Sequence, residues 1–200
     1  LLPTAEDICQ LRAGPYVKSA APIMPDPNAP KSPATATINV TYNGFTPQAE
    51  AAFQRAVDIW ATHIQSPITI NVVANFANLG AGVLGSARPA GSFFGTVNGE
   101  RSIYGVALLE AIIGRDVNAA GAPDIETNFN SNFPNWHYGS GPAPPSDFDF
   151  TTVVLHELGH GLNFTGTMNV TGGVGSWGFN TGVPGIYDQF AQNSFGTPLV

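Results

Sequence analysis

The sequence predicts an α+β fold, in which β-strands are combined with an amphipathic helix and a second, buried helix. Three observations lead to this prediction. Residues 35–42 alternate β-branched and polar side chains, as a strand does, and residues 46–64 repeat apolar side chains at helical spacing. Residues 150–162 are apolar over a length that suits a buried helix. With 200 residues, 43% of them hydrophobic, the chain is long enough to bury a full core.

The first 34 residues are rich in proline and show no periodicity. We therefore expect residues 1–34 to form an extended arm or the remnant of a pro-region. The chain starts at Leu1 without the charged and apolar segments of a signal peptide, which favours earlier removal of a signal or pro-segment. Cys9 is the single cysteine and cannot form an internal disulfide. Its thiol is interpreted as buried or unpaired, as paired with a cysteine outside this chain, or as a ligand of a metal in a latent form.

Regular structure is predicted from Thr35 onward, beginning with the strand over residues 35–42. The next element is a helix over residues 46–64, because Thr46 can cap it and Pro47 suits the first helical position.

Beyond this helix the sequence predicts a second strand over residues 67–76 and a Gly-rich loop over residues 78–99. Residues 103–113 suit a short helix or strand. Residues 124–130 alternate polar and apolar side chains, which predicts a strand with one polar face, and residues 132–146 read as a loop.

Charge and hydropathy exclude two classes of partner. Only 10% of residues are charged, and the formal net charge is −7 with a pI of about 4.8. Nucleic acid is therefore not an expected partner, because its phosphates require clustered Lys and Arg. No apolar run reaches the roughly 18 residues of a membrane span. The few charges and the abundant Gly, Pro, Asn, Thr and Ser are typical of an extracellular protein with many ordered loops.

The most informative motif is His156-Glu157-Leu158-Gly159-His160. Two histidines at i and i+4 on a helix can bind one metal ion, and imidazole nitrogens bind zinc at about 2.0–2.1 Å. Glu157 stands where a carboxylate can take a proton from a water attacking a substrate. Asp147 and Asp149 offer N-cap oxygens for this helix, and Gly161 suits its C-cap.

The stretch Phe-Thr-Thr-Val-Val-Leu-His-Glu-Leu-Gly-His-Gly-Leu, residues 150–162, resembles the active-site helix of the matrixin-type metzincins. It is more similar still to secreted bacterial zinc peptidases of the same superfamily. The resemblance extends over residues 35–165 and implies a zincin-like upper lobe at 35–161, in which a twisted mixed sheet is backed by one helix and carries the active-site helix. A short or incomplete, loop-rich lower lobe would follow at 162–200. Together, residues 35–200 would form a zinc peptidase catalytic domain. The strand at 124–130 would then lie at the rim of the cleft, either as a plain edge strand or paired with an extended substrate.

The sequence departs from the metzincin pattern at the third zinc ligand. Metzincins continue after the second histidine with Gly-x-x-His, but Asn163 and Gly166 occupy these positions here. A catalytic zinc needs three protein ligands and one open position. Asp188 is one candidate for the third, as a carboxylate of the kind that gluzincins and aspzincins use, although it can equally cap a short helix over residues 189–190. His137 is a second candidate, and a residue beyond Val200, in a further segment or chain, is a third.

Several other side chains are candidates for roles around the site. Tyr187, Tyr138 and His137 could stabilise the charge of a tetrahedral transition state or line a cleft. Asp147 and Asp149, with Asp116 or Asp124, could hold Ca²⁺, although capping of the metal helix is the simpler interpretation of the first two.

The expected function is a secreted, zinc-dependent endopeptidase that acts on polypeptide, with Glu157 as general base. Two alternatives stay open. One is a non-catalytic extracellular binding or adhesion module on a zincin scaffold, which the missing third histidine favours. The other is a zinc amidase that acts on a non-protein amide or a cell-wall peptide.

Overall fold

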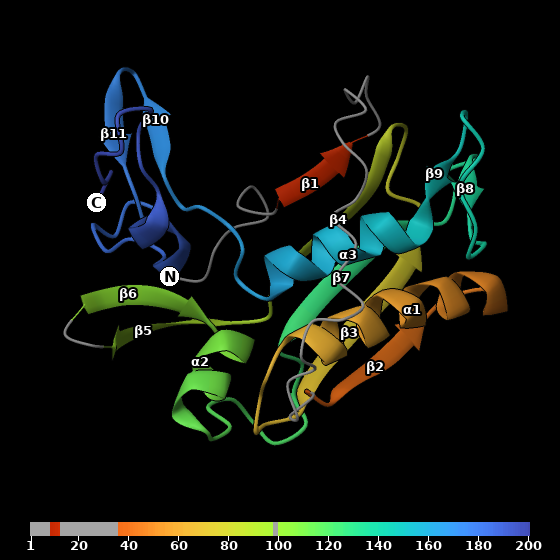
Figure 1. The fold of residues 1–200 in the computed structure, drawn as a ribbon, viewed down its shortest axis with the longest axis horizontal. Coiled ribbons are helices and arrows are strands. Elements are labelled where there is room, and N and C mark those ends of the chain that lie inside the picture. Colours follow the sequence, from red (N-terminus) through yellow and green to blue (C-terminus); the bar gives the residue numbers. More distant parts are fainter. Residues whose placement is uncertain (1–8, 13–35, 98–99) are drawn as a thin grey trace.

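The computed structural model describes residues 9–12, 36–97 and 100–200 (Figure 1). This part of the chain is mixed α+β, with a five-stranded mixed sheet and three α-helices, which confirms the predicted α+β class. None of the described helices is long and apolar enough to cross a bilayer.

The main sheet has the strand order β1-β4-β7-β3-β2. Strands β2, β3 and β7 run parallel, whereas β4 is antiparallel to β7 and β1 is antiparallel to β4. The register joins Ile38 to Ile70 between β2 and β3, and Val72 to Ile125 between β3 and β7. The strands are β1 (Cys9–Arg12), β2 (Ile38–Asn43), β3 (Ile70–Ala77), β4 (Val83–Pro89) and β7 (Ile125–Asn130).

Two helices, α1 (Pro47–His63) and α3 (Phe150–Gly161), pack against each other over the same face of this sheet (Figure 1). The α1 helix begins as the sequence predicts, because Thr46 Oγ1 accepts a hydrogen bond from Ala49 N at 3.3 Å and Pro47 follows the cap. Its buried face presents small side chains and Phe53, which allows α3 to approach closely. The α3 helix lies above β4 and β7, which brings the predicted metal-binding motif onto the sheet.

An aromatic cluster forms the centre of the core between α3 and the sheet. Phe150 is fully buried, and its ring lies 4.9 Å from Trp136 and 5.3 Å from Phe129, measured between centroids. Tyr138 packs on a further side of this ring, at 5.3 Å. Such contacts add to the burial of a large apolar surface, so Phe150 anchors the first turn of α3.

Replacing Phe150 with alanine is expected to lower the free energy of unfolding by about 3–5 kcal/mol, because the change leaves a cavity among packed aromatic rings. Urea unfolding followed by tryptophan fluorescence measures the change. Phe195, whose side chain is 91% exposed, provides the matched control. Its replacement with alanine should stay within about 0.5 kcal/mol of the original chain. Equal losses in the two variants would contradict the core position of Phe150.

The predicted Gly-rich loop over residues 78–99 was wrong. This region contains β4 and β5 (Ser92–Val97), and β5 pairs antiparallel with β6 (Glu100–Gly105), which leads into helix α2 (Val106–Ile113). The glycine at 85 serves close packing of strands, since a Cβ there would lie 2.8 Å from the ring of Phe129. Glycine in this region indicates a loop by composition, but Gly85 lies within strand β4, where the neighbouring Phe129 leaves no room for a side chain.

The expected edge position of residues 124–130 was also wrong. Strand β7 lies between β4 and β3, so both of its edges are paired. Two of its polar side chains are buried, since Thr127 is fully buried and Asn130 is 2% exposed, whereas Glu126 and Asn128 are half-buried. Asn130 Nδ2 donates to the carbonyl oxygens of Gly80 and Val83, both at 2.8 Å. The alternation of polar residues therefore reflects satisfied buried hydrogen bonds, and the outer strands of the sheet are β1 and β2.

Strand β1 falls inside the predicted arm, so regular structure begins earlier than Thr35. It pairs with β4 from Cys9↔Ala87 to Arg12↔Val83. The rest of the arm, residues 1–8 and 13–34, lies outside the described residues, as do the side-chain contacts of Cys9.

Residues 162–200 form a separate, largely irregular unit beside the sheet (Figure 1). It contains a small hairpin of β10 (Asn169–Thr171) and β11 (Val174–Ser176) and a 3₁₀ helix, η2 (Ile186–Phe190). Ile103 N in β6 donates to Pro184 O at 2.9 Å, which ties this unit to β6.

A last pair, β8 (Trp136–His137) and β9 (Phe148–Asp149), lies at the start of α3.

Candidate metal site

The helix that carries the histidines is fixed at both ends. Asp149 Oδ1 accepts a hydrogen bond from Thr152 N at 2.6 Å, so Asp149 is the N-cap. At the other end, Gly161 lies inside the last turn and Leu162 is the C-cap, which corrects the expected C-cap at Gly161. A Cβ at Gly161 would collide with the side chain of Ile125 on β7. Glycine is required there because the helix and the sheet approach so closely.

The two motif histidines converge on one point. His156 Nε2 and His160 Nε2 lie 3.0 Å apart, and their rings are nearly perpendicular, at 89°. Two nitrogens bound to one tetrahedral zinc lie about 3.3 Å apart, given bond lengths of about 2.0–2.1 Å. The pair therefore fits a single metal ion with little adjustment.

The second ring nitrogen of His160 is held by the loop that follows α3. Nδ1 donates to the carbonyl oxygen of Phe164 at 2.9 Å and lies 3.0 Å from Thr165 Oγ1. A proton on Nδ1 leaves the lone pair of the neutral ring on Nε2, which faces His156. Metal-binding histidines typically have such a backbone partner for the nitrogen that does not bind the metal.

Burial lowers the pKa of His156, and the neighbouring His160 lowers it further. Both effects disfavour the imidazolium form, which would place two positive charges side by side. The neutral ring, which is the form that binds a metal, is thereby favoured.

Glu157 is fully buried and lies between the two histidines in the sequence of the helix. Burying a carboxylate is costly, and proteins rarely do so without a functional or pairing reason. A fully buried glutamate next to two histidines that converge on one point is a candidate for a chemical role.

Asn163 occupies the position at which metzincins have glycine, and its backbone conformation explains why asparagine or glycine suits this position. Its φ is 79°, in the left-handed region that glycine and asparagine tolerate best. The Asn163 side-chain oxygen also accepts a hydrogen bond from Gly105 N, at the N-cap of α2. The chain therefore turns after α3 without glycine and gains a contact to a neighbouring helix.

An alanine at position 163 is expected to lower the free energy of unfolding by about 1–2 kcal/mol, because alanine has the left-handed penalty and lacks the hydrogen bond. Asn163→Gly should lose less, since only the hydrogen bond is removed. Thermal unfolding of the two variants beside the original chain measures the order. An alanine variant as stable as the glycine variant would contradict the role of the backbone conformation.

Asp188 is placed by hydrogen bonds to the loops around it. Its fully buried carboxylate accepts from Thr167 N at 2.9 Å, from the Thr167 hydroxyl and from Gly185 N at 3.0 Å. Within the described residues, no group of three or more His, Cys, Asp and Glu side chains is placed to hold a metal ion, so Asp188 is not brought together with the two histidines. It instead clamps the start and the end of the segment from Thr167 to Gly185.

The clamp nevertheless lies next to the position of the metzincin third ligand. A Cβ on Gly166 would be 3.2 Å from Asp188 Oδ1. The two histidines are thus accompanied, among the described residues, by a buried carboxylate next to Gly166.

The structure places His137 and Tyr138 at the wrong end of α3 for the roles considered for them. His137 pairs in register with Asp149, the N-cap, and its Nε2 donates to Gly141 O at 3.1 Å. Asp149 and His160 are eleven positions apart, or about 16 Å along a helix. Tyr138 packs on Phe150 in the first turn of the helix, and its backbone oxygen accepts from Arg55. Within the described residues, His137 therefore does not join His156 and His160 in a group that could hold a metal ion, and Tyr138 packs at the first turn of the helix.

Tyr187, in contrast, lies near the histidine end of α3. Its ring centroid is 6.4 Å from that of Phe164, whose carbonyl holds His160, and its side chain is 45% exposed. The Phe164 ring in turn lies 6.0 Å from Trp60, whose indole donates to Leu155 O at 3.1 Å. The contact of Trp60 with Phe164 and α3 was not expected from the sequence. Helical spacing indicates only that Trp60 lies on the apolar face of α1.

The carboxylates considered for calcium are not assembled into one site. Asp149 caps α3, and Asp147 Oδ1 accepts from the hydroxyl of Ser146 at 2.8 Å. Asp124 and Asp116 belong to a different region, before β7. No cluster of three or more acidic or metal-binding side chains forms from them in the part of the chain that the structure describes. Capping, the simpler interpretation, is confirmed for Asp149.

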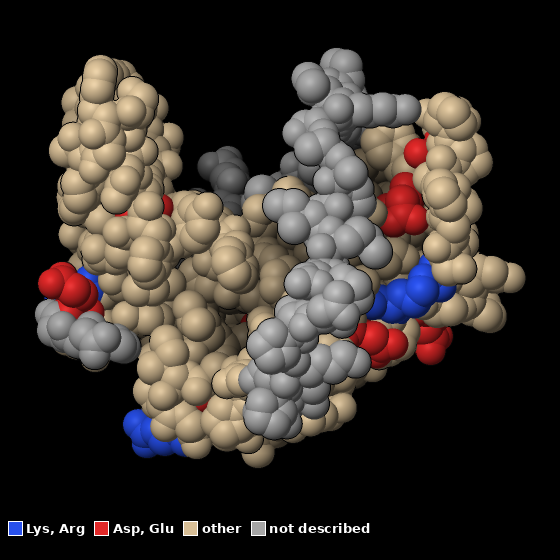
Figure 2. Space-filling model, viewed as in Figure 1, with Lys and Arg blue, Asp and Glu red and all other residues tan. Residues whose placement is uncertain are grey.

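The β10–β11 unit projects from the described surface in the space-filling view (Figure 2). Few charged side chains are visible on this face, in keeping with the low charge of the whole chain.

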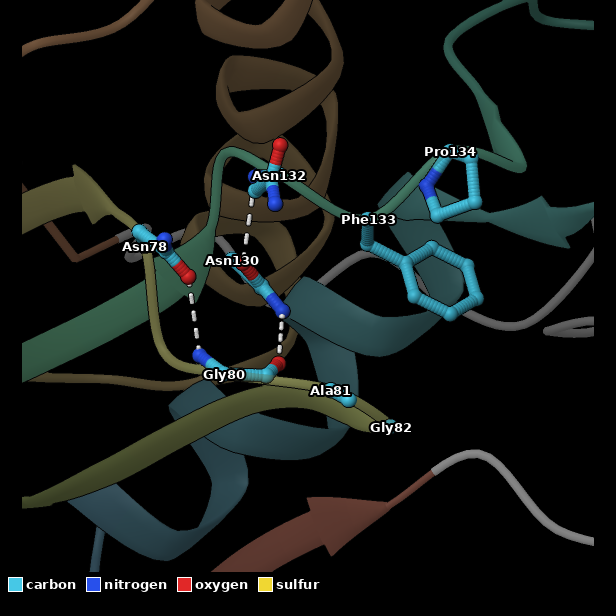
Figure 3. A pocket seen from close by; sticks show the side chains of 8 residues that line it. All are labelled: Asn78, Gly80, Ala81, Gly82, Asn130, Asn132, Phe133 and Pro134. Carbon is cyan, nitrogen blue, oxygen red and sulfur yellow. Dashed lines mark hydrogen bonds between the residues drawn. The ribbon is translucent and has the colours of Figure 1, made fainter.

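A separate pocket of about 420 Å³ lies where β3 and β7 end, near the opposite end of α3 (Figure 3). Its central side chain, Asn130, accepts from Leu79 N and Asn132 N as well as donating twice, so its amide is occupied by the protein itself. We interpret this pocket as a structural feature, because the loop beside it is held by the hydrogen bonds of Asn130. Its walls are formed by Asn78, Gly80, Ala81, Gly82, Asn130, Asn132, Phe133 and Pro134.

Comparison with family models, with curated proteins and with solved structures found no match to this chain. The interpretation of the site therefore depends on its own residues and geometry.

Proposed function

We propose that this protein is a secreted, zinc-dependent endopeptidase of the zincin type. The observation that supports this best is the convergence of His156 Nε2 and His160 Nε2 to 3.0 Å, with the other nitrogen of His160 donating to Phe164 O. Two Nε2 atoms at 3.0 Å can share a hydrogen bond, and the hold of Phe164 O on the other nitrogen of His160 is what favours a metal between them. The helix on a mixed sheet, followed by a short irregular unit, is consistent with a zincin-like arrangement.

In this proposal, different residues of the chain bind the metal, transfer the proton and stabilise the developing charge. Zinc, when bound, supplies a Lewis acid that polarises a carbonyl group and lowers the pKa of water. His156 and His160 hold the metal, and the Phe164 carbonyl keeps the His160 ring in the required tautomer. Glu157 takes a proton from the attacking water and passes it to the leaving amine. Tyr187 is the candidate for a hydrogen bond to the developing negative charge.

A second candidate function is a non-catalytic extracellular binding module on the same scaffold. The observation that favours it is the absence of a third ligand beside the two histidines among the described residues. The buried Glu157 favours the enzyme, because a purely structural metal has no use for a base. The zinc amidase differs from the endopeptidase only in substrate.

Zinc content per chain, measured by elemental analysis after dialysis against metal-free buffer, tests the proposal. We expect one zinc per chain, loss of that zinc in His160→Ala, and cleavage of casein that a chelator abolishes. His63→Ala is the control, because His63 is an exposed histidine at the end of α1. Zinc without any cleavage would favour the binding module. A chain that retains no zinc would contradict the metal site itself.

A further inference from the structure

The outer edge of strand β4 lies beneath the helix that carries the histidines. Helix α3 packs on β4 and β7, whereas β2, at the opposite edge of the sheet, lies beneath α1. The end of β4 is also the histidine end of α3. A Cβ on Gly105 would be 2.7 Å from the side chain of Pro89, the last residue of β4, and 2.6 Å from that of Asn163, which follows α3. An extended chain that reaches the histidines along the sheet must therefore lie along β4.

This edge of β4 is occupied by four residues of the same chain. Strand β1 pairs antiparallel with β4 from Cys9↔Ala87 to Arg12↔Val83, and it also contacts α3 (Figure 1). Its first residue lies opposite Ala87, shortly before β4 ends at Pro89, so β1 begins at the histidine end of the helix. The structure thus has an extended peptide segment seated beside the candidate metal site.

The residues of β4 at the centre of this pairing are small. They are Gly85, Ser86 and Ala87. None of them has a side chain large enough to select or exclude a particular neighbour on the adjacent strand. Recognition by such an edge depends on main-chain N–H and C=O groups, which every extended polypeptide presents. The edge therefore fits an extended polypeptide of varied sequence.

Strand β1 is held by a shorter pairing than the strands next to it. The pairing covers four residues, and its register shifts between Leu11 and Arg12. By comparison, β2 has six residues and pairs with β3 along its whole length. In the described sheet, β4 is the one strand that β1 pairs with. Short edge segments of this kind open at low free energy while the rest of a fold stays intact.

We propose that the outer edge of β4 is the binding site for the polypeptide substrate, and that β1 occupies it as an internal competitor. Because this inference rests on the proposed endopeptidase, the partner is an extended polypeptide chain. A segment of the same chain competes at an effective concentration on the order of millimolar. The apparent affinity of an added peptide falls with the fraction of molecules whose edge is free. Strand β1 therefore limits hydrolysis until it leaves the edge, and the substrate then pairs with β4 in its place.

A disulfide between positions 9 and 87 tests this competition, because Cys9 is the single cysteine and lies opposite Ala87 in the register. Facing residues of an antiparallel pair have Cα atoms about 4.5–5.5 Å apart, within the range that a disulfide spans. In Ala87→Cys, oxidised glutathione should lock β1 on β4, and a phosphine reductant should release it. Binding of fluorescein-labelled casein is measured by anisotropy with the full chain in a Glu157→Gln background, so that the casein stays intact.

We expect the oxidised Ala87→Cys chain to bind casein at least about tenfold more weakly than the same chain after reduction, since the locked edge is never free. The matched control combines Ala87→Cys with Cys9→Ser. It cannot form the disulfide, so oxidation should not change its affinity. Equal affinities of the oxidised and reduced chains would overturn the proposal. Failure of the disulfide to form in a folded chain would also overturn it, because β1 would then not lie opposite Ala87.

Two proline variants test the same competition without a change in β4. Neighbouring residues of an antiparallel strand point their N–H groups alternately toward the partner strand and away from it. One of Gln10→Pro and Leu11→Pro therefore removes a hydrogen bond to β4. That variant should bind casein about 2–10-fold more tightly than the original chain, which corresponds to the net contribution of one hydrogen bond. The other should bind like the original chain, and unchanged affinity in both would contradict the role of β1.

Hydrolysis separates this inference from the proposed function. With Glu157 in place and zinc supplied, cleavage of casein should follow the same order as binding among the variants. Casein that is bound in this order but never cleaved would contradict the endopeptidase and leave the binding edge of β4 established. Cleavage that is equally fast in the oxidised and reduced Ala87→Cys chains would support the endopeptidase and overturn the competition by β1.

Discussion

Peptide hydrolysis is expected to fall by about 10²–10⁴-fold when Glu157 is replaced with glutamine, while the zinc stays bound. The change keeps the size of a fully buried side chain in the middle of α3, so the packing of the helix is preserved. It removes the only described group placed next to His156 in the sequence that can accept a proton from the attacking water. The two histidines of the proposed metal site are untouched.

The experiment combines turnover of casein with zinc content of the same preparation. Circular dichroism and the melting temperature establish that the variant is folded. Glu126→Gln serves as the control, since Glu126 forms an ion pair with Arg88 on the sheet and has no place in the proposed chemistry. Turnover retained in Glu157→Gln would exclude Glu157 as the base. Simultaneous loss of zinc and turnover would instead mean that the carboxylate supports the metal site.

The second large effect is expected at Asp188. Asp188→Ala should lower the free energy of unfolding by about 3–5 kcal/mol, because it leaves three donors without a buried acceptor. These donors are the backbone N–H groups of Thr167 and Gly185 and the hydroxyl of Thr167. The loss should be concentrated in residues 166–190, where hydrogen exchange would report loss of protection.

Asp188→Asn separates this clamp from a role in metal binding. Asparagine keeps the volume of the side chain and one acceptor oxygen, so we expect a smaller loss of stability than for Asp188→Ala and an unchanged zinc content. If the folded Asp188→Asn chain no longer holds zinc, the carboxylate is the third ligand after all, and the clamp in the metal-free chain rearranges on binding. Thermal unfolding and elemental analysis of one preparation distinguish the two roles.

Elements with strong local signals were predicted well. Thr46-Pro47 located the start of α1, and the apolar run around His156 located α3, because capping and periodicity are properties of a few neighbouring residues. The order of strands in the sheet was harder to predict. Residues 78–99 contain two strands although their glycines indicate a loop, and β7 is central although its polar alternation indicates an edge strand. In both cases the deciding contacts, such as Gly85 against Phe129, join segments far apart in the sequence.

The candidate site also combines features set by neighbouring residues with features set by contacts between distant segments. The spacing of His156 and His160 on one helix is local, and their convergence followed from it. The position of His137 beside the N-cap of α3, and the capture of Asp188 by Thr167 and Gly185, depend on how distant loops meet. No pattern of residue types along the chain contains this information.

The contact between Gly161 and Ile125 has a consequence for how this sequence can vary. The last turn of α3 approaches β7 so closely that any side chain at 161 would enter the space of the isoleucine. Related sequences that preserve the arrangement should therefore have glycine at 161. Where they do not, a smaller residue should replace Ile125 in the same sequence. Substitutions at these two positions should be inherited together, even though neither residue binds a ligand in the proposed mechanism.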